Sequence, residues 1–168
     1  MPYMQTPYRK AGKYTLQPND PYLSQDKYLD LERELDKLLK KRPFATFEVS
    51  RLAELGDFSE NVEYQLAKGK LRGINGAISK IQVQLNSAIL IDQKGESTNI
   101  DLGSVVIVKV NGKEKQYKIL GSSESKPEKG IISHNSPIAQ LLLGKKVGDK
   151  VSLKLKDKSV EYEIMKVN

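Results

Sequence analysis

Residues 28–52, YLDLERELDKLLKKRPFATFEVSRL, carry seam side chains alternately three and four residues apart. The same spacing returns in residues 64–85, YQLAKGKLRGINGAISKIQVQL. This spacing is typical of the contact seam between two helices of a coiled coil. The seam positions are Tyr28, Leu31, Leu35, Leu38, Arg42, Ala45, Val49 and Leu52 on the first arm, and Tyr64, Ala67, Leu71, Ile74, Ile78, Ile81 and Leu85 on the second.

The two seams match each other when the chain folds back on itself. Residue 52 then faces 64, and residue 31 faces 85, so the fold-back centres on residue 58. We therefore expect residues 27–87 to form an antiparallel helical hairpin with arms of about 45 Å, at about 1.5 Å per residue. Pro43 should kink or split the first arm, because proline removes a helix hydrogen bond. Glycines at positions 69, 73 and 76 lie off the seam, each at a cost of about 1 kcal/mol relative to alanine.

Residues 88–168 change from helical to strand periodicity. Apolar and polar residues alternate in four segments, and Asn111-Gly112 between the first two is a hairpin turn signal. A short helix is expected from Ser136-Pro137 through Leu143, closed by Gly144. The expected fold is a hairpin followed by a small α+β domain with an antiparallel sheet. Its strand segments are SVVIVKV (104–110), KQYKIL (115–120), KVSLKLK (150–156) and SVEYEIMKV (159–167), the last pair joined at Asp157-Lys158.

Composition narrows the possible classes of function. The chain has 168 residues, a net charge of +7, no cysteine and one histidine, His134. The absence of cysteine excludes disulfides and thiolate metal sites, and a single histidine makes a histidine-based metal cage implausible. No apolar run reaches the length of a membrane span or a signal core, so we expect a cytoplasmic protein without membrane contact. The positive charge favours polyanionic partners or acidic protein surfaces.

Residues 1–26 hold four of the eight tyrosines and four of the seven prolines, without helical or strand periodicity. This composition is typical of a flexible tail. Its tyrosines are either solvated or part of a motif that becomes ordered on a partner.

Acidic residues gather at the expected turn, in GDFSENVEY (56–64). Glu54, Asp57, Glu60 and Glu63 lie between Arg51 and Lys68 without an intervening Lys or Arg. One interpretation is helix capping, since Asp57-x-x-Glu60 resembles a capping box. An EF-hand is excluded, because its required glycine and glutamate positions are Val62 and Lys68. A third interpretation is that the two carboxylates complete a Mg²⁺ site that belongs mainly to another molecule, because Mg²⁺ is commonly shared in this way.

Three features resemble the Gre transcript-cleavage factors of bacterial RNA polymerase. They are GDFSENVEY, the distance from Pro43 to Gly56, and the run ISHNSPIAQLLLGKKVGD at residues 132–149. The resemblance spans about residues 28–168. It implies a coiled-coil hairpin (27–87) and an FKBP-like domain (88–168), in agreement with the patterns above.

In that family the C-terminal domain docks on the polymerase, and the hairpin enters the secondary channel. The resemblance implies that Asp57 and Glu60 help to hold a second Mg²⁺ at the polymerase active site, where backtracked RNA is hydrolysed. It implies either a water-orienting or a capping role for Ser59. We expect a monomeric factor that is not itself an enzyme, whose partners are RNA polymerase and the 3′ end of nascent RNA.

Basic residues lie farther from the turn. Candidate RNA contacts in the channel are Arg42, Lys68, Lys70 and Arg72, although such residues also occur on ordinary solvated coiled-coil faces. KGKLRGI (68–74) is somewhat more similar to the GreB branch than to the GreA branch.

Two other functions stay open from the sequence. One is a secondary-channel regulator that does not stimulate cleavage, which the intact acidic turn disfavours. The other is a proline isomerase, which the fold alone would suggest. Residues 88–168 disfavour it, since they contain no Trp, no Phe and only Tyr117 and Tyr162, too few to line an aromatic pocket.

Overall fold

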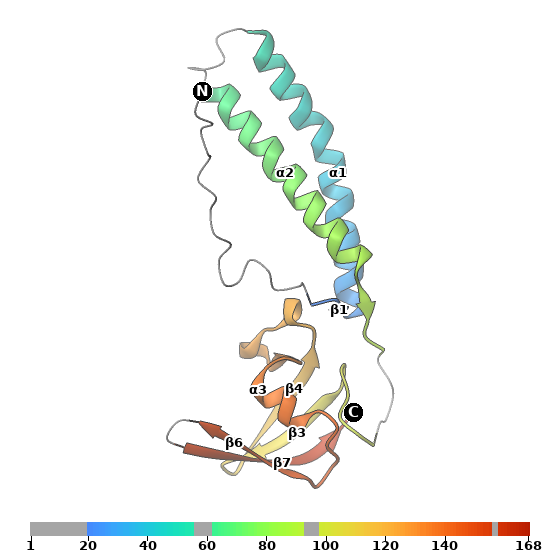
Figure 1. Ribbon diagram of the computed structural model, residues 1–168, viewed down its shortest axis with the longest axis vertical. Helices are drawn as coiled ribbons and strands as arrows, with labels where there is room; N and C mark the ends of the chain where they lie inside the picture. The colour runs from blue at the N-terminus through green and yellow to red at the C-terminus, as the bar shows by residue number, and fades with distance from the viewer. Residues whose placement is uncertain (1–19, 56–61, 93–97, 156–157) are drawn as a thin grey trace, which may run out of the picture.

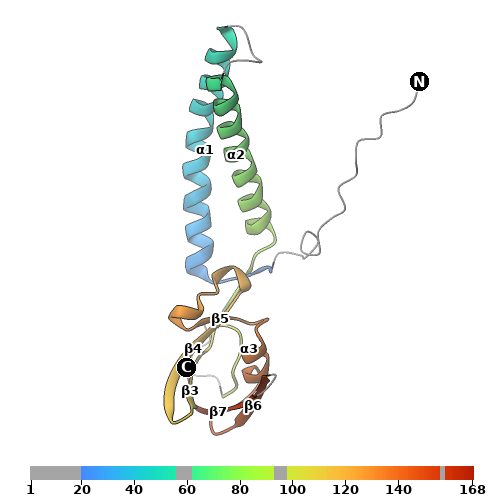
Figure 2. The same cartoon turned by 90° about the vertical axis from the view of Figure 1, so that its left-hand side faces the viewer.

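A computed structural model describes residues 20–55, 62–92, 98–155 and 158–168. A long helical hairpin stands on a small curled sheet domain (Figures 1 and 2). Helix α1 (Gln25–Glu54) and helix α2 (Val62–Asn86) lie side by side, as the seam spacing predicted. No helix in the described ranges is both long and apolar enough to cross a membrane.

The hairpin packs most closely at its base. Leu31 of α1 and Ile81 of α2 are buried together with Leu23, and the other apolar side chains of this cluster are Tyr28, Leu35, Leu38, Leu85 and Ala88. Farther along, Ala45, Leu52 and Ile78 are also buried. Arg42, which was expected on the seam, is exposed instead. A guanidinium is costly to bury without a partner, so the long side chain of Arg42 extends from this position into solvent.

Helix α1 runs unbroken through Pro43, so the expected split does not occur. Proline denies a hydrogen bond to the carbonyl four residues earlier, at Leu39. Leu39 lies on the exposed side of the helix, where water can hydrogen-bond that carbonyl. The helix begins at Ser24, whose hydroxyl accepts a hydrogen bond from the backbone N–H of Lys27 at 3.2 Å.

The sheet domain has the strand order β5-β4-β3-β7-β6. The strands are β3 (Val105–Val110), β4 (Lys113–Leu120), β5 (Ile131–Ser133), β6 (Lys150–Leu155) and β7 (Lys158–Val167). The β3–β4, β3–β7 and β6–β7 pairs are antiparallel, as expected. The β4–β5 pair is parallel, so the sheet is mixed and the expectation of a wholly antiparallel sheet was wrong in this detail.

The predicted turn at Asn111-Gly112 and the predicted short helix are confirmed, whereas the turn expected at Asp157-Lys158 lies partly outside the described residues. Asn111 and Gly112 have φ values of 50° and 78°, which are the positive angles that a tight hairpin turn requires. Helix α3 (Pro137–Leu142) is capped by Ser136, whose hydroxyl accepts from the N–H of Ala139. Ala139 and Leu142 are completely buried and join the main core of the sheet. The short helix therefore covers one side of the curled sheet (Figure 2).

A small two-stranded ladder joins the two parts of the fold. Strand β1 (Tyr22–Leu23) pairs in parallel with strand β2 (Ile89–Leu90), just beyond the two helix ends. Two short 3₁₀ turns of the sheet domain, η1 (Ser122–Glu124) and η2 (Pro127–Lys129), follow β4. Residues 20–26 were expected in the tail, but β1 and the start of α1 make them part of the fold.

Three glycines of α2 provide a test of its stability. A Cβ added at Gly69, Gly73 or Gly76 would meet no atom within 4 Å. We expect Gly69→Ala, Gly73→Ala and Gly76→Ala each to raise the free energy of unfolding of the hairpin by about 0.5–1 kcal/mol, because alanine restricts the unfolded chain and favours helix. Denaturant titration followed by helical circular dichroism measures this change.

Gly121 is the matched control for these substitutions. A Cβ at this position would clash with the backbone oxygen of Tyr22. Gly121→Ala should therefore destabilise the protein by about 2 kcal/mol or more, because backbone must move to relieve the clash. Equal effects of Gly121→Ala and Gly73→Ala would contradict the close approach of β1 to the sheet domain.

Candidate functional site

In the sequence, the predicted metal ligands lie between the two helices of the hairpin. Asp57, Ser59 and Glu60 are outside the described residues, so their role stays a prediction. The flanking helix ends are described: α1 ends at Glu54 and α2 begins at Val62, and both ends lie at the same extremity (Figure 1). Within the described ranges no group of three or more acidic, histidine or cysteine side chains could hold a metal.

The four candidate RNA contacts are all exposed but do not form one surface. Lys68 and Lys70 are two residues apart on α2, so they point about 200° apart around the helix axis. The Lys68 ammonium lies over the ring of Tyr64, 5.5 Å from its centroid, in a cation–π contact. Lys70 instead borders a groove between α1 and α2. Arg72 is four residues from Lys68 and lies on the same side as Lys68.

This groove, which we name the shaft groove, has a volume of about 320 Å³. Its walls come from both helices: Lys41, Phe44, Ala45 and Glu48 from α1, and Ala67, Lys70 and Ile74 from α2. The groove opens where two alanines occupy the seam, because their side chains are too short to fill the space between helix axes. It lies in the half of the hairpin nearer the acidic turn.

Phe44 and Lys41 were not among the residues singled out from the sequence. The available signal was a large aromatic side chain beside the seam rather than on it, next to small seam residues. The side chain of Phe44 is 78% exposed. Glu48, on the same wall, accepts two hydrogen bonds from Arg51, at 3.1 and 2.7 Å. These bonds hold the pKa of Glu48 below its ordinary value, so the carboxylate is ionised and already paired.

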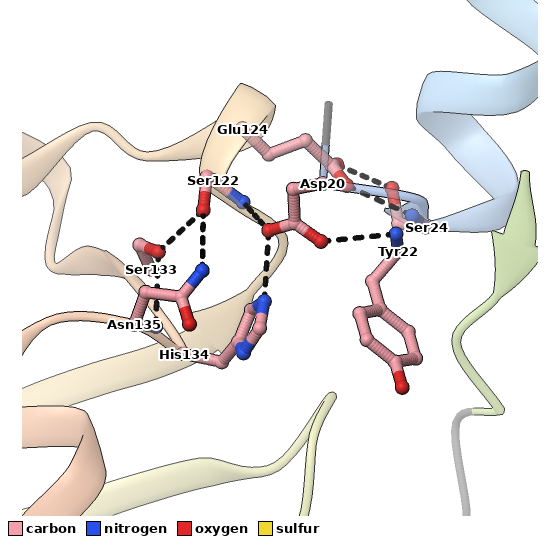
Figure 3. Close-up of polar contacts among 8 residues, drawn as sticks. All are labelled: Asp20, Tyr22, Ser24, Ser122, Glu124, Ser133, His134 and Asn135. Carbon is pink, nitrogen blue, oxygen red and sulfur yellow. Dashed lines mark hydrogen bonds and ion pairs between the residues drawn. The ribbon is translucent and has the colours of Figure 1, made fainter. Parts of the chain in front are cut away.

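A second polar cluster, the junction network, anchors the base of the hairpin on the sheet domain (Figure 3). Asp20 accepts hydrogen bonds from the N–H groups of Tyr22 (3.1 Å) and Ser122 (2.6 Å), and its Oδ2 lies 2.8 Å from His134 Nε2. The Ser24 hydroxyl donates to Glu124 at 2.5 Å, and the Ser24 N–H donates to the same carboxylate at 2.8 Å.

The His134 side chain is 19% exposed, and its ring meets the ring of Tyr22 edge to face, 5.3 Å between centroids. Because His134 lies beside an aspartate and two serines, we considered whether these residues form a hydrolytic triad. The geometry does not support one, because the Ser122 and Ser133 hydroxyls lie 2.9 Å apart and hydrogen-bond to each other. His134 is therefore a structural residue of the junction, more specific in its contacts than the simple loop residue expected from the sequence.

The aromatic side chains of the sheet domain are part of its core. Tyr162 is buried there and Tyr117 packs against the same cluster. Burial raises the pKa of both phenols. Both rings therefore contribute to packing within the sheet domain, Tyr162 as a buried residue and Tyr117 as a partly buried one.

Comparison with known proteins matches both parts of the chain. Residues 21–89 match the family described as "Transcription elongation factor, N-terminal". Residues 94–168 match "Transcription elongation factor, GreA/GreB, C-term". The transcription elongation factor GreA of a Nitratiruptor species is 34% identical over 148 residues, which cover 86% of this chain and 91% of the relative. The transcription elongation factor GreA of Bacillus cereus is 38% identical over 149 residues, which cover 86% and 94%.

Two solved structures show a weaker similarity. The crystal structure of GreA factor homolog 1 (Gfh1) of Thermus thermophilus is 24% identical with a TM-score of 0.40, covering 87% of this chain and 97% of the other. A GreA/GreB factor of Nitrosomonas europaea is 18% identical with a TM-score of 0.39, covering 72% and 93%. Both scores are low, so the assignment to a family rests on the sequence matches.

The junction network generates a prediction about pH. Burial raises the pKa of Asp20, but hydrogen bonds from Ser122, Tyr22 and His134 outweigh it and hold that pKa below its ordinary value of 3.8. A carboxyl whose pKa is lowered in the folded state stabilises the fold above its unfolded pKa, and this contribution is lost as the pH falls through the folded pKa. We expect Asp20→Asn to cost about 1–2 kcal/mol at neutral pH and progressively less below about pH 4.

Thermal unfolding of both proteins between about pH 2 and pH 7, a range that spans the titration of a carboxyl group, measures this difference. Asp26→Asn, on the exposed first turn of α1, is the control for loss of one negative charge. A stability difference between Asp20→Asn and wild type that stays constant across this range would contradict a charged Asp20 in the junction.

Proposed function

Because the chain belongs to the GreA/GreB family of transcription elongation factors, we propose that it stimulates cleavage of backtracked nascent RNA by bacterial RNA polymerase. In this proposal the hairpin enters the secondary channel and the sheet domain stays at its mouth. The catalytic centre is part of the polymerase, and this chain contributes side chains to it without being an enzyme itself.

The observation that carries the proposal is the hairpin with its acidic end. Helix α1 has 30 residues and α2 has 25. At about 1.5 Å per residue, α1 spans about 45 Å. The ends of α1 and α2 far from the sheet domain (Figure 1) are joined in the sequence by the segment that contains Asp57 and Glu60. The fold therefore supports presentation of two carboxylates deep in a narrow channel.

The donor set fits a shared Mg²⁺ rather than one held by this protein alone. Asp57 and Glu60 offer hard carboxylate oxygens, which Mg²⁺ prefers, but two such residues do not complete an octahedral shell. The nearest described acids, Glu54 and Glu63, are exposed and keep this end of the hairpin negative. When bound, the ion supplies the charge stabilisation and water activation of a two-metal site. Asp57 and Glu60 would hold it, and Ser59 would orient a metal-bound water or cap α2.

We expect Asp57→Asn with Glu60→Gln to lower the rate of RNA cleavage at least roughly tenfold, the lower end of the cost of disturbing the surroundings of a metal ion. These substitutions remove charge but keep the shape of each side chain. The measurement uses the cognate RNA polymerase stalled in a backtracked complex with labelled RNA and Mg²⁺, and follows the release of short 3′ fragments.

The matched control is Glu54→Gln with Glu63→Gln, which removes the same charge from the two helix ends and should retain cleavage. Equal loss in both double variants would show a general effect of charge rather than metal binding. If wild type binds the polymerase but releases no fragments, the chain is instead a channel-occupying regulator that does not stimulate cleavage.

A further inference from the structure

We infer that the shaft groove binds an unpaired nucleobase of single-stranded RNA, with Phe44 as the stacking surface. This inference rests on the proposed function, which brings the hairpin beside extruded RNA in the secondary channel. It adds a site on the hairpin that is separate from the acidic turn, and it concerns where the extruded RNA lies rather than how it is cut.

Phe44 is available for stacking because the fold does not use it. Its neighbour Ala45 fills the buried seam position, while the Phe44 ring remains 78% exposed at the edge of the groove. Phe47 is similarly exposed, at 68%, but it lies on the next turn and does not line the groove. An aromatic face beside a groove of about 320 Å³ suits a planar ring, since small-molecule sites start near this size.

The charges around the groove favour an anionic ligand. Lys41 and Lys70 face it from different helices, and among the described residues neither makes an ion pair or hydrogen bond. Glu48 is the acidic wall residue; Arg51 pairs with it at 2.7 Å, and Lys70 adds a longer-range attraction. Within the described ranges neither Lys41 nor Lys70 is held by an ion pair, so both can attract phosphates beside the aromatic ring, which is the combination that single-stranded RNA sites use.

The same charges disfavour the chain's own N-terminal segment as the occupant. Residues 1–19 contain Arg9, Lys10 and Lys13 and no Asp or Glu. A segment of that charge would be repelled by Lys41 and Lys70, whereas RNA would be attracted. Both the tyrosines of the N-terminal segment and the bases of RNA could stack on Phe44, but only RNA carries the negative charge that the two lysines attract.

The position of the groove along the hairpin sets the length of extruded RNA that can reach it. Phe44 lies ten residues before Glu54, the last residue of α1, which is about 15 Å at about 1.5 Å per residue. One strand of nucleic acid advances by about 3.4 Å or more per nucleotide. RNA extruded from an active site at the acidic turn would therefore reach the groove after about three to five nucleotides, but not after one or two.

The test compares complexes of the cognate polymerase backtracked by two or by six nucleotides, with the full-length factor. We expect Phe44→Ala to lower the ratio of the six-nucleotide to the two-nucleotide cleavage rate about tenfold, within the range measured for loss of base stacking. Phe44→Tyr should keep the ratio because it keeps the ring. Phe44→Leu should lose it, which separates stacking from general apolar contact. Phe47→Ala is the matched control and should keep the wild-type ratio.

A second readout does not depend on cleavage. RNA with 2-aminopurine two nucleotides before its 3′ end, which is the fourth extruded nucleotide after backtracking by six, changes fluorescence when that base stacks. Asp57→Asn with Glu60→Gln can serve as the background. A change that appears at six nucleotides, is absent at two and is lost with Phe44→Ala supports the inference. No change at six nucleotides, or equal changes with Phe44→Ala and Phe47→Ala, overturns it. Fragment release by wild type without a Phe44-dependent signal would overturn the groove alone, while fluorescence change without fragment release would overturn the proposed cleavage alone.

Discussion

The junction at the base of the hairpin is the constraint on which the rest of the molecule depends. The β1–β2 ladder is only two residues long, with Tyr22 opposite Ile89 and Leu23 opposite Leu90. A helix of about 45 Å stands on it, so a rotation of about 10° at the base would move the far end by about 8 Å. Placing carboxylates in a catalytic centre tolerates far less than this. The stiffness of this short ladder therefore determines how precisely the far end of the hairpin is positioned.

The junction gains stiffness from polar groups that are almost completely satisfied. Ser24 caps α1 and donates to Glu124 with the same hydroxyl, so the start of the helix and the sheet domain share one atom. Asp20 receives two backbone N–H groups and lies against His134. Gly121 allows the backbone of Tyr22 to approach more closely than any side chain would permit. Such a network is rigid while each partner is present and weak once one is removed, because an unpaired buried polar group is costly.

The hairpin, unlike the junction, is packed unevenly along its length. Its packing is tight near the base, where large apolar side chains meet, and loosens where alanines occupy the seam on both helices. This change leaves the shaft groove and an exposed phenylalanine at its edge. A Cβ added at any of the three glycines of α2 would meet no neighbouring atom, so no close approach requires glycine there. They reduce stability without a packing benefit in this structure, and we have no physical account of them.

Much of this architecture follows from local patterns. The seam spacing of three and four predicted both helices and their antiparallel pairing, since one face of each helix must bury its apolar side chains. Asn111-Gly112 and Ser136-Pro137 predicted a turn and a helix start, because both depend on backbone preferences of the residues themselves. Residue types at the expected turn left both helix capping and metal ligation open for Asp57 and Glu60, and the resemblance to the Gre factors favoured metal ligation; both residues lie outside the described ranges.

Other features depended on residues that are distant in the chain. Periodicity placed Arg42 on the seam, but the cost of desolvating its charge keeps the side chain in solvent. Nothing local indicated that β5 would join β4 in parallel, because the partner of a three-residue edge strand is chosen by the whole sheet. Likewise, Asp20 and His134 are 114 positions apart, and only the folded chain brings them together. By itself the sequence determined the elements, their apolar faces and the acidic turn, through short-range backbone and side-chain preferences. The tertiary structure alone decided the junction network and the shaft groove, because both are made of side chains whose neighbours come from different elements.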